Sequence, residues 1–310
     1  MKKLLTALIV AVIVAASFLF VNFNGKKADN REHVLHTGIL GYHGITEQAF
    51  QSGFDNFRDF ILSSDDEINV SKDTFIKSFV KEQRVFHFYD SLMAMMMDLK
   101  SGKIDEMILP ESVGRYLLSK NSSYKNAFST EILTSNVCFG FKEGNAALRD
   151  KFDKVIKEMD SDGTLDKIED KYIDTSADRE PEPIRPKKIN DAEELKIVVT
   201  GDMPPIDMFA GDGQPAGYNT AVLSEIGKRL SKNIKFINAD TGGRSAALFS
   251  GRADVVFWYR AAQSNVKGRD PLDNLFADAP EGVILSIPYY SWDNEIVIRM
   301  NDKHVLLGLF

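Results

Sequence analysis

The sequence predicts an α/β protein made of two lobes of similar design. Both halves of the chain alternate short runs of β-branched and aromatic residues with segments that carry apolar residues at helical spacing, a pattern typical of a parallel sheet covered by helices. Between them, residues 174–194 hold three prolines among many charges, which favours a semi-extended linker. We therefore expect an N-terminal segment at 1–30, one half at 31–173, this linker, and a second half at 195–310.

The order of elements is similar in the two halves. In the second half, strands are expected at 195–200, 234–237 and 253–259, and helices at 221–231 and 245–250. In the first half, strands are expected at 68–70, 85–88 and 107–109, helices at 73–81, 92–100 and 112–119, an extended run at 132–141, and amphipathic helices at 148–159 and 165–172.

Both halves also contain the pattern Ser-Gly-Lys/Arg-x-Asp, at 101–105 and at 250–254, where a helix gives way to a strand. Glycine suits the left-handed residue that ends many helices, so we expect Gly102 and Gly251 to adopt a positive φ. The shared pattern at the same structural position supports two related lobes.

The charge balance and the cysteine content exclude several classes of protein. With 38 Lys and Arg against 45 Asp and Glu, the net charge is −7, whereas a general nucleic-acid binder would need a basic face. The single cysteine, Cys138, excludes an internal disulfide and a cysteine-cluster metal site. We expect neither a metal nor a cofactor.

The N-terminus indicates export. Lys2 and Lys3 precede an uncharged apolar run at 4–23, as in an export signal. The run is long enough to span a membrane, and cleavage at the small residues 15–17 would leave an apolar mature end, which favours an uncleaved anchor over a cleaved signal. In either case we expect residues 30–310 outside the cytoplasm, and a retained anchor would tether them to the cytoplasmic membrane.

Four stretches of the second half carry a more specific combination of motifs: LKIVVTGDMPPIDMFAGDGQPAGYNTAVLSEIGKRL, IKFINAD, ALFSGRADVV and ILSIPYYSWDNEIVIR. In this order they resemble the first lobe of the extracytoplasmic solute-binding proteins of family 3, the amino-acid receptors of ABC importers. The first half is similar to that family's second lobe and C-terminal helices, in LKSGKIDEMILPESVGRYLL, NVCFGFKEGNAALRDKF and MDSDGTLDKIEDKYI, whereas residues 31–66 show no match. The resemblance implies a two-lobed, periplasmic-binding-protein-like fold of type II.

The order of the lobes departs from that of the family, in which the first lobe leads. Here the half similar to the second lobe comes first, and the similarity to the first lobe ends after 296–299, where a family member would cross into its second lobe. Either the chain is a circular permutant, with 174–194 joining the usual termini, or it holds two incomplete copies of a tandem array. Exchange of lobes between two chains is a third route to complete lobes.

The resemblance also implies a clamp for a zwitterion, with a cation and helix amides for the carboxylate, a carboxylate for the ammonium and an aromatic wall. Met203 stands in place of the aromatic wall residue, and Trp258 and Tyr259 are candidates to line the cleft. Arg260, at a strand end, is the preferred cation, and Lys267 and Arg269 are alternatives. The competing interpretation is a solvated loop with ordinary surface charges.

In the half similar to the second lobe, Pro110 takes the position of the family's ammonium-binding aspartate, and Glu111 is the substitute carboxylate. Ser71 and Thr74 open the helix whose amides would bind the ligand carboxylate. Each has a structural alternative, because acidic residues are favoured in the first turn of a helix and Ser and Thr are common caps.

Together these features predict an extracytoplasmic binding protein, not an enzyme, that closes two lobes on a small polar solute such as an amino acid. Its partner would be an ABC permease or a membrane signalling protein. The alternative is a degenerate structural or interaction module that has lost its ligand, as the departures at Met203 and Pro110 indicate. A dehydratase-like enzyme would need an acid–base pair in the cleft, which Glu111 with Arg260 or Lys267 does not resemble.

Overall fold

A computed structural model of the chain describes residues 34–40, 46–63, 82–174, 179, 181–240, 242–261 and 279–301. The apolar run expected to enter the membrane, at 4–23, lies outside these ranges, as do Ser71, Thr74, Lys267 and Arg269 and the elements expected at 68–70 and 73–81. None of the helices within the described ranges is long and apolar enough to cross a membrane.

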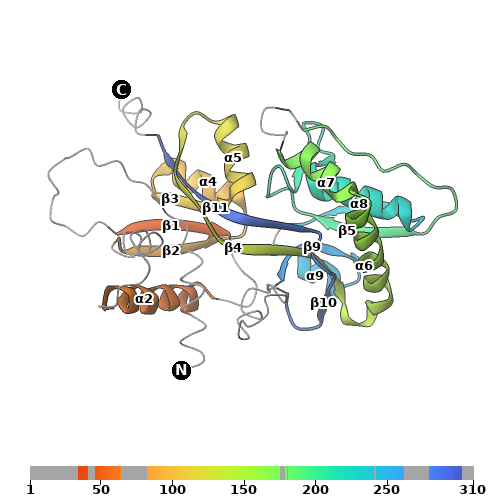
Figure 1. The fold of residues 1–310 in the computed structure, drawn as a ribbon, viewed down its shortest axis with the longest axis horizontal. Helices are drawn as coiled ribbons and strands as arrows, with labels where there is room; N and C mark the ends of the chain where they lie inside the picture. Colours follow the sequence, from red (N-terminus) through yellow and green to blue (C-terminus); the bar gives the residue numbers. More distant parts are fainter. Residues whose placement is uncertain are drawn as a thin grey trace.

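The structure has two lobes, which we name the β1 lobe and the β5 lobe after their first strands (Figure 1). In the β1 lobe, β1 pairs in parallel with β2 and β3, and β3 pairs antiparallel with β11, which in turn pairs with β4. The sheet order is therefore β2-β1-β3-β11-β4. The bounds are β1 (Leu35–Leu40), α2 (Glu47–Ser63), β2 (Arg84–Tyr89), α4 (Leu92–Ser101), β3 (Glu106–Pro110), α5 (Glu111–Lys120), β4 (Tyr124–Lys142) and β11 (Tyr290–Met300).

The β5 lobe repeats this order. β5 pairs in parallel with β8, a bridge from Ile197 to Val255 joins β5 to the segment that becomes β9, and β4 pairs antiparallel with both β9 and β10. The order β8-β5-β9-β4-β10 matches that of the other lobe strand for strand. The bounds are α6 (Ala146–Ser161), α7 (Thr164–Glu169), a π-helical turn (Asp170–Asp174), β5 (Glu194–Val199), β6 (Met208–Phe209), β7 (Pro215–Ala216), α8 (Gly217–Arg229), β8 (Asn233–Asn238), α9 (Arg244–Phe249), β9 (Val256–Ala261) and β10 (Val283–Leu285).

Two long strands connect the lobes. Residues 124–131 of β4 pair with β11 in the β1 lobe, whereas residues 136–142 pair with β9 and β10 in the β5 lobe. In Figure 1, β4 and β11 run side by side from one lobe to the other. Each lobe therefore uses strands from both halves of the sequence to complete its sheet.

Local sequence signals explain most of the helices. In α4 the Ser91 side chain accepts a hydrogen bond from the Ala94 amide at 3.2 Å, which caps the first turn. The expectation of left-handed glycines is confirmed, because Gly102 has φ 78° and Gly251 has φ 72°. The predicted helices at 92–100, 112–119, 148–159, 165–172, 221–231 and 245–250 correspond to α4, α5, α6, α7, α8 and α9.

The segment without a sequence match, 31–66, contains β1 and α2. In α2, Phe50 and Phe54 lie one turn apart and are both fully buried, packing edge-on against Phe86 of β2. β1 carries Gly38 at its centre, where an added Cβ would lie 2.7 Å from Ile104 and 2.8 Å from Met95. The glycine lets α4 approach the sheet, and it also weakens the β-propensity signal of this strand.

A buried ionic cluster lies in the β1-lobe sheet, at the end of the strands that is farther from the β5 lobe. Glu106 of β3 is fully buried and accepts hydrogen bonds from Thr37 at 2.8 Å, from Arg84 Nε at 3.0 Å and from Arg299 at 2.6 and 2.9 Å. The Arg84 side chain is fully buried as well, and it also binds Glu82 at 2.6 Å. One carboxylate thus ties together β1, β2, β3 and β11.

The linker contacts both lobes. Residues 181–189 contain neither helix nor strand. The Lys120 side chain, from α5 of the β1 lobe, donates to the Arg179 carbonyl at 3.0 Å, while the Ile184 amide donates to the Pro215 carbonyl of β7 at 3.0 Å. Asn233 exchanges hydrogen bonds with the Ile189 backbone at 2.8 Å in each direction. This segment is therefore fixed along the β5 lobe and reaches α5 of the other lobe.

Candidate functional site

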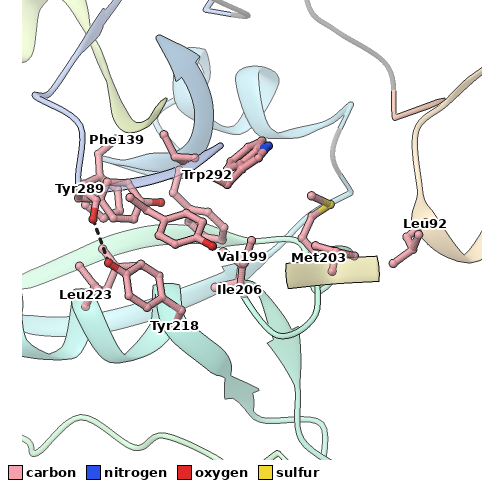
Figure 2. Packing of buried hydrophobic residues seen from close by; sticks show 14 of the residues in the cluster. Leu92, Phe139, Val199, Met203, Ile206, Tyr218, Leu223, Tyr289 and Trp292 are labelled. Carbon is pink, nitrogen blue, oxygen red and sulfur yellow. Dashed lines mark hydrogen bonds between the residues drawn. The ribbon is translucent and has the colours of Figure 1, made fainter. Parts of the chain in front are cut away.

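The lobes meet where the carboxyl ends of their parallel strands face each other, which is where open α/β sheets bind ligands. The β1 lobe contributes the start of α4 after β2, and the β5 lobe contributes the turn after β5 and the loop between β8 and α9. Leu92 and Met203 belong to one buried apolar cluster that includes residues of both lobes, and Figure 2 shows Leu92 reaching toward Met203. This junction is the candidate site.

The turn after β5 presents an apolar wall. Met203 is 3% exposed and Ile206 is fully buried. The turn is closed by two backbone hydrogen bonds between Met203 and Asp207, at 2.8 and 2.9 Å. Met203 therefore packs within the core at the turn after β5, and its role as a wall for the ligand stays a prediction.

The base of the β5 lobe is held by an aromatic and polar network. Tyr289 stacks on Phe139 with ring centroids 4.0 Å apart, and the Tyr218 hydroxyl donates to the Tyr289 carbonyl at 2.9 Å (Figure 2). The Tyr289 hydroxyl donates to Asn219 Oδ1 at 2.8 Å. Burial raises the pKa of Tyr289 well above its usual value, so this hydroxyl stays a donor at physiological pH. The network joins α8 to β4 beneath the turn that follows β5.

Asp207 fixes the loop that carries Met203. Its Oδ2 accepts hydrogen bonds from the Thr200 amide at 2.9 Å, the Thr200 hydroxyl at 2.6 Å and the Gly201 amide at 3.1 Å, while the buried Oδ1 has no partner. Burial raises the pKa of Asp207 to about 6, outweighing the three donors that favour the ionised form. The loop position therefore depends on a carboxyl group that titrates near neutral pH.

This pKa predicts a pH dependence of stability. Because the pKa of Asp207 is higher in the folded protein than its ordinary 3.8, folding favours the protonated form. The stabilisation is complete below pH 4 and is lost as the pH rises through about 6, by up to roughly 3 kcal/mol. Urea unfolding at pH 4 to 7 should show the parent losing stability relative to Asp207→Asn over this interval. A difference that stays constant with pH would contradict the assignment.

Two carboxylates from opposite lobes flank the loop before α9, and the sequence interpretation missed both. Asp90 follows β2 and Asp240 follows β8, and both are exposed. A Cβ added to Gly242 would lie 4.0 Å from Asp90 Oδ1 and 3.8 Å from Asp240 Oδ1. Asp240 Oδ1 also accepts a hydrogen bond from the Gly243 amide. The available signal was an acidic residue two or three positions after a predicted strand in each half.

The ligand-binding candidates Trp258, Tyr259 and Arg260 all lie on β9. Arg260 pairs with Val137 and Tyr259 with Cys138 of β4, and Trp258 precedes them in the same strand. Arg260 is therefore within the strand, one residue before its end at Ala261. Its role as the ligand cation stays a prediction, as does that of Lys267 outside the described ranges.

Glu111 is the first residue of α5, directly after Pro110 at the end of β3, and is partly exposed. It lies within electrostatic reach of Tyr290, whose hydroxyl bonds the Ser112 hydroxyl at 3.3 Å. This places Glu111 near the start of the crossing strand β11. The role of Glu111 as a ligand carboxylate stays a prediction.

A pocket of ≈ 470 Å³ lies beside the linker. Tyr116 of α5 lines it from one lobe, Pro205, Met208 and Gly217 line it from the other, and Pro181 of the linker lines it as well. Tyr116 also packs against the apolar hairpin formed by β6 and β7. The pocket therefore spans the lobe junction, and closure of the lobes would change its shape.

Comparisons with known proteins agree with this architecture. The profile of the bacterial extracellular solute-binding proteins, family 3, matches residues 37–175 and 195–261. The match begins within β1, so the expectation that residues 31–66 are unmatched is wrong for most of that stretch. The helix that follows β1 in this lobe is α2, which begins at Glu47, and the prediction for Ser71 and Thr74 lies outside the described residues.

Several solved structures are similar at low identity, and no curated protein matches the sequence. A zinc-bound ligand-binding component of an ABC-type import system from Staphylococcus aureus is 11% identical, with a TM-score of 0.41 over 89% of this chain and 68% of that one. An ancestral arginine-binding protein is 15% identical, with a TM-score of 0.39 over 90% and 88%. A truncated arginine-binding protein from T. maritima is 11% identical, with a TM-score of 0.39 over 89% and 92%.

Proposed function

Because this chain belongs to family 3 of the bacterial extracellular solute-binding proteins, we propose that it captures a small polar solute bearing an ammonium group, such as an amino acid, between its two lobes. The observation that carries the proposal is the meeting of Asp90 and Asp240 from opposite lobes around Gly242. Two carboxylates at the carboxyl ends of β2 and β8 suit a cation that bridges the lobes.

The ligand's carboxylate would be held from other directions. Arg260, near the end of β9, and Lys267 are the proposed cations, with Trp258 and Tyr259 alongside Arg260. The first turn of α4, capped by Ser91, adds free amides and the positive end of a helix dipole. Met203 would supply an apolar wall, which suits the aliphatic part of an amino acid better than a stacking contact.

Closure would take place about the crossing strands. β4 and β11 are the two strands that pair in both lobes, so bending there moves one sheet relative to the other without breaking either. We propose binding without chemistry. The family's location outside the cell makes an ABC permease or a membrane signalling protein the partner class that would read closure, with residues 4–23 as the proposed tether.

We also propose that one chain forms the whole clamp. β11, from the second half, inserts between β3 and β4 of the first, and β4 inserts between β9 and β10 of the second. This arrangement supports circular permutation over two incomplete copies, and it predicts one solute site per chain.

Titration calorimetry of the full chain against a panel of amino acids and small amines tests the proposal. A binding compound should lose about 10- to 100-fold in affinity in Asp90→Asn, because a charge-assisted hydrogen bond is removed without changing the side-chain shape. Asp240→Asn should lose a similar factor, and the exposed Asp160→Asn on α6 is the matched control. A compound that binds all these variants equally would refute the role of the acid pair.

One observation favours the second candidate, a module of this fold without a ligand. Leu92 and Met203 fill part of the junction with buried apolar side chains. A titration in which none of the compounds binds the parent would support that alternative.

A further inference from the structure

The pocket beside the linker has an apolar floor. Pro205, Met208 and Gly217 of the β5 lobe line it, and all three are buried. Met208 packs with Ala210 and Ala216 in the small apolar cluster of the β6–β7 hairpin. The pocket volume of ≈ 470 Å³ lies within the range of about 300–1,000 Å³ that is typical of small-molecule sites. Every residue that lines the pocket belongs to the described ranges.

Two tyrosines line the pocket from different elements. Tyr116 belongs to α5 of the β1 lobe, Tyr172 belongs to the π-helical turn after α7, and both are partly exposed. Pro181 and Pro183 of the linker line the pocket as well. Tyrosine and proline rings offer flat apolar surfaces, which suit contact with an aromatic ring.

The charged residues of the pocket are exposed and carry a positive excess. Within the described lining, Lys171 and Arg179 are the cations and Glu182 is the carboxylate, and all three are exposed. Lys171 Nζ lies 4.9 Å from the centroid of the Tyr172 ring, so one of the cations is held beside an aromatic surface. A ligand in this pocket would therefore meet apolar surface on the floor and positive charge nearer to solvent.

A second lysine adds to this positive charge from the β1 lobe. Lys120 Nζ lies 5.5 Å from the centroid of the Tyr116 ring and donates to the Arg179 carbonyl at 3.0 Å. The charge is opposite in sign to that of Asp90 and Asp240, neither of which lines the pocket. The pocket and the proposed solute site therefore suit ligands of opposite charge.

We propose that this pocket is a second binding site, for a small aromatic anion such as an aromatic carboxylate or sulfonate. The ring would lie against Tyr116, Tyr172 and the buried floor, and the anionic group would lie near Lys171 and Arg179. Because Tyr116 comes from the β1 lobe and the floor from the β5 lobe, a bound anion would contact both lobes. Its binding does not require a solute at the acid pair.

Fluorescence titration of the full chain with anilinonaphthalene sulfonate (ANS), an aromatic anion, tests the proposal. The folded parent should bind one ANS per chain. Tyr116→Ala should weaken binding by about 10-fold, because it removes an aromatic wall. Lys171→Glu should weaken it by about 5-fold, because it reverses a charge beside the sulfonate. The exposed Lys157→Glu on α6 is the matched control and should bind ANS as the parent does.

Phenylnaphthylamine, which has the same rings without the sulfonate, separates the two contributions. Its affinity should fall in Tyr116→Ala and stay unchanged in Lys171→Glu. ANS also binds partly folded chains, so circular dichroism and cooperative urea unfolding check that each variant is folded.

Asp90→Asn tells the two sites apart, because it alters the proposed solute site and should leave ANS affinity unchanged. Three results would overturn the proposal: no ANS binding by the folded parent, equal ANS affinity in the parent, Tyr116→Ala and Lys171→Glu, or an equal loss in Lys157→Glu. A loss of ANS affinity in Asp90→Asn would overturn the separation of the sites. None of these readouts requires that the chain bind an amino acid.

Discussion

Glu106→Gln is expected to lower the free energy of unfolding by about 3–5 kcal/mol, because it removes the buried one of the two carboxylates that bind the fully buried guanidinium of Arg84. Glutamine keeps the shape of the side chain and one acceptor oxygen, so the loss of stability measures the contribution of the negative charge. Arg299 is 27% exposed and can turn toward water, whereas Arg84 cannot. Urea unfolding at pH 7, followed by circular dichroism, measures the effect.

Glu82→Gln is the matched control. Glu82 binds the same Arg84 side chain at 2.6 Å, but its carboxylate is 49% exposed, so its loss should cost only about 0–1 kcal/mol. Equal destabilisation by Glu106→Gln and Glu82→Gln would contradict the prediction that the buried ion pair contributes more to stability than the exposed one.

The ionic cluster also predicts a response to acid. Burial alone would raise the pKa of Glu106, but Arg84 and Arg299 outweigh it and hold that pKa below its usual 4.5. Because the folded pKa is lowered, the stabilisation is present above pH 4.5 and is lost as the pH falls through the folded pKa. The gap in stability between the parent and Glu106→Gln should therefore narrow in acid. This pH dependence of stability runs in the opposite direction to that expected for Asp207. Measuring Glu106→Gln and Asp207→Asn together therefore separates the contributions of the two carboxyl groups.

Gly217→Ala is expected to destabilise the protein by about 3 kcal/mol. Gly217 begins α8 with φ 87°, which costs about 1–2 kcal/mol for alanine, and its Cβ would lie 2.4 Å from the Pro205 carbonyl oxygen. The backbone there cannot withdraw easily, because the Tyr218 amide donates to Pro205 at 3.1 Å and the Asn219 amide donates to Ile206 at 2.8 Å. Thermal and urea unfolding both report the change.

The variant Gly213→Ala separates the backbone penalty from the steric clash, the two causes of the destabilisation expected for Gly217→Ala. Gly213 has φ 76°, but no atom lies within 4 Å of an added Cβ, so Gly213→Ala carries only the backbone penalty of about 1–2 kcal/mol. If both variants lost the same stability, the close approach of α8 to the turn would not matter. Loss of solute binding in Gly217→Ala at a temperature where it stays folded would further indicate that this contact positions the turn that carries Met203.

Helices with a clear apolar face could be predicted from the sequence, and long-range pairings could not. The spacing of Leu92, Met95 and Leu99 predicts α4, and all three are buried. β1 escaped prediction because Gly38 interrupts a short strand whose partners lie far along the chain. Glu106 gave no signal of its own, because its partners come from three other strands.

The candidate site was predicted only in outline. Met203 follows a strong strand signal, and its motif placed it beside the cleft. Asp90 and Asp240 come from opposite lobes, and only the folded arrangement brings them together. Family resemblance directed attention to Glu111 at the position after β3 and did not point to Asp90 after β2.

The insertion of β11 between β3 and β4 has a consequence for biogenesis. Arg299 follows Glu106 by 193 positions, so the ribosome releases the first four strands of the β1 lobe long before the strand that fills their sheet. Until then the β3 edge has unpaired backbone groups and the Glu106 carboxylate lacks one of its arginines. The β1-lobe sheet is therefore completed only once β11 has been made, and until then its open edge can associate with other chains.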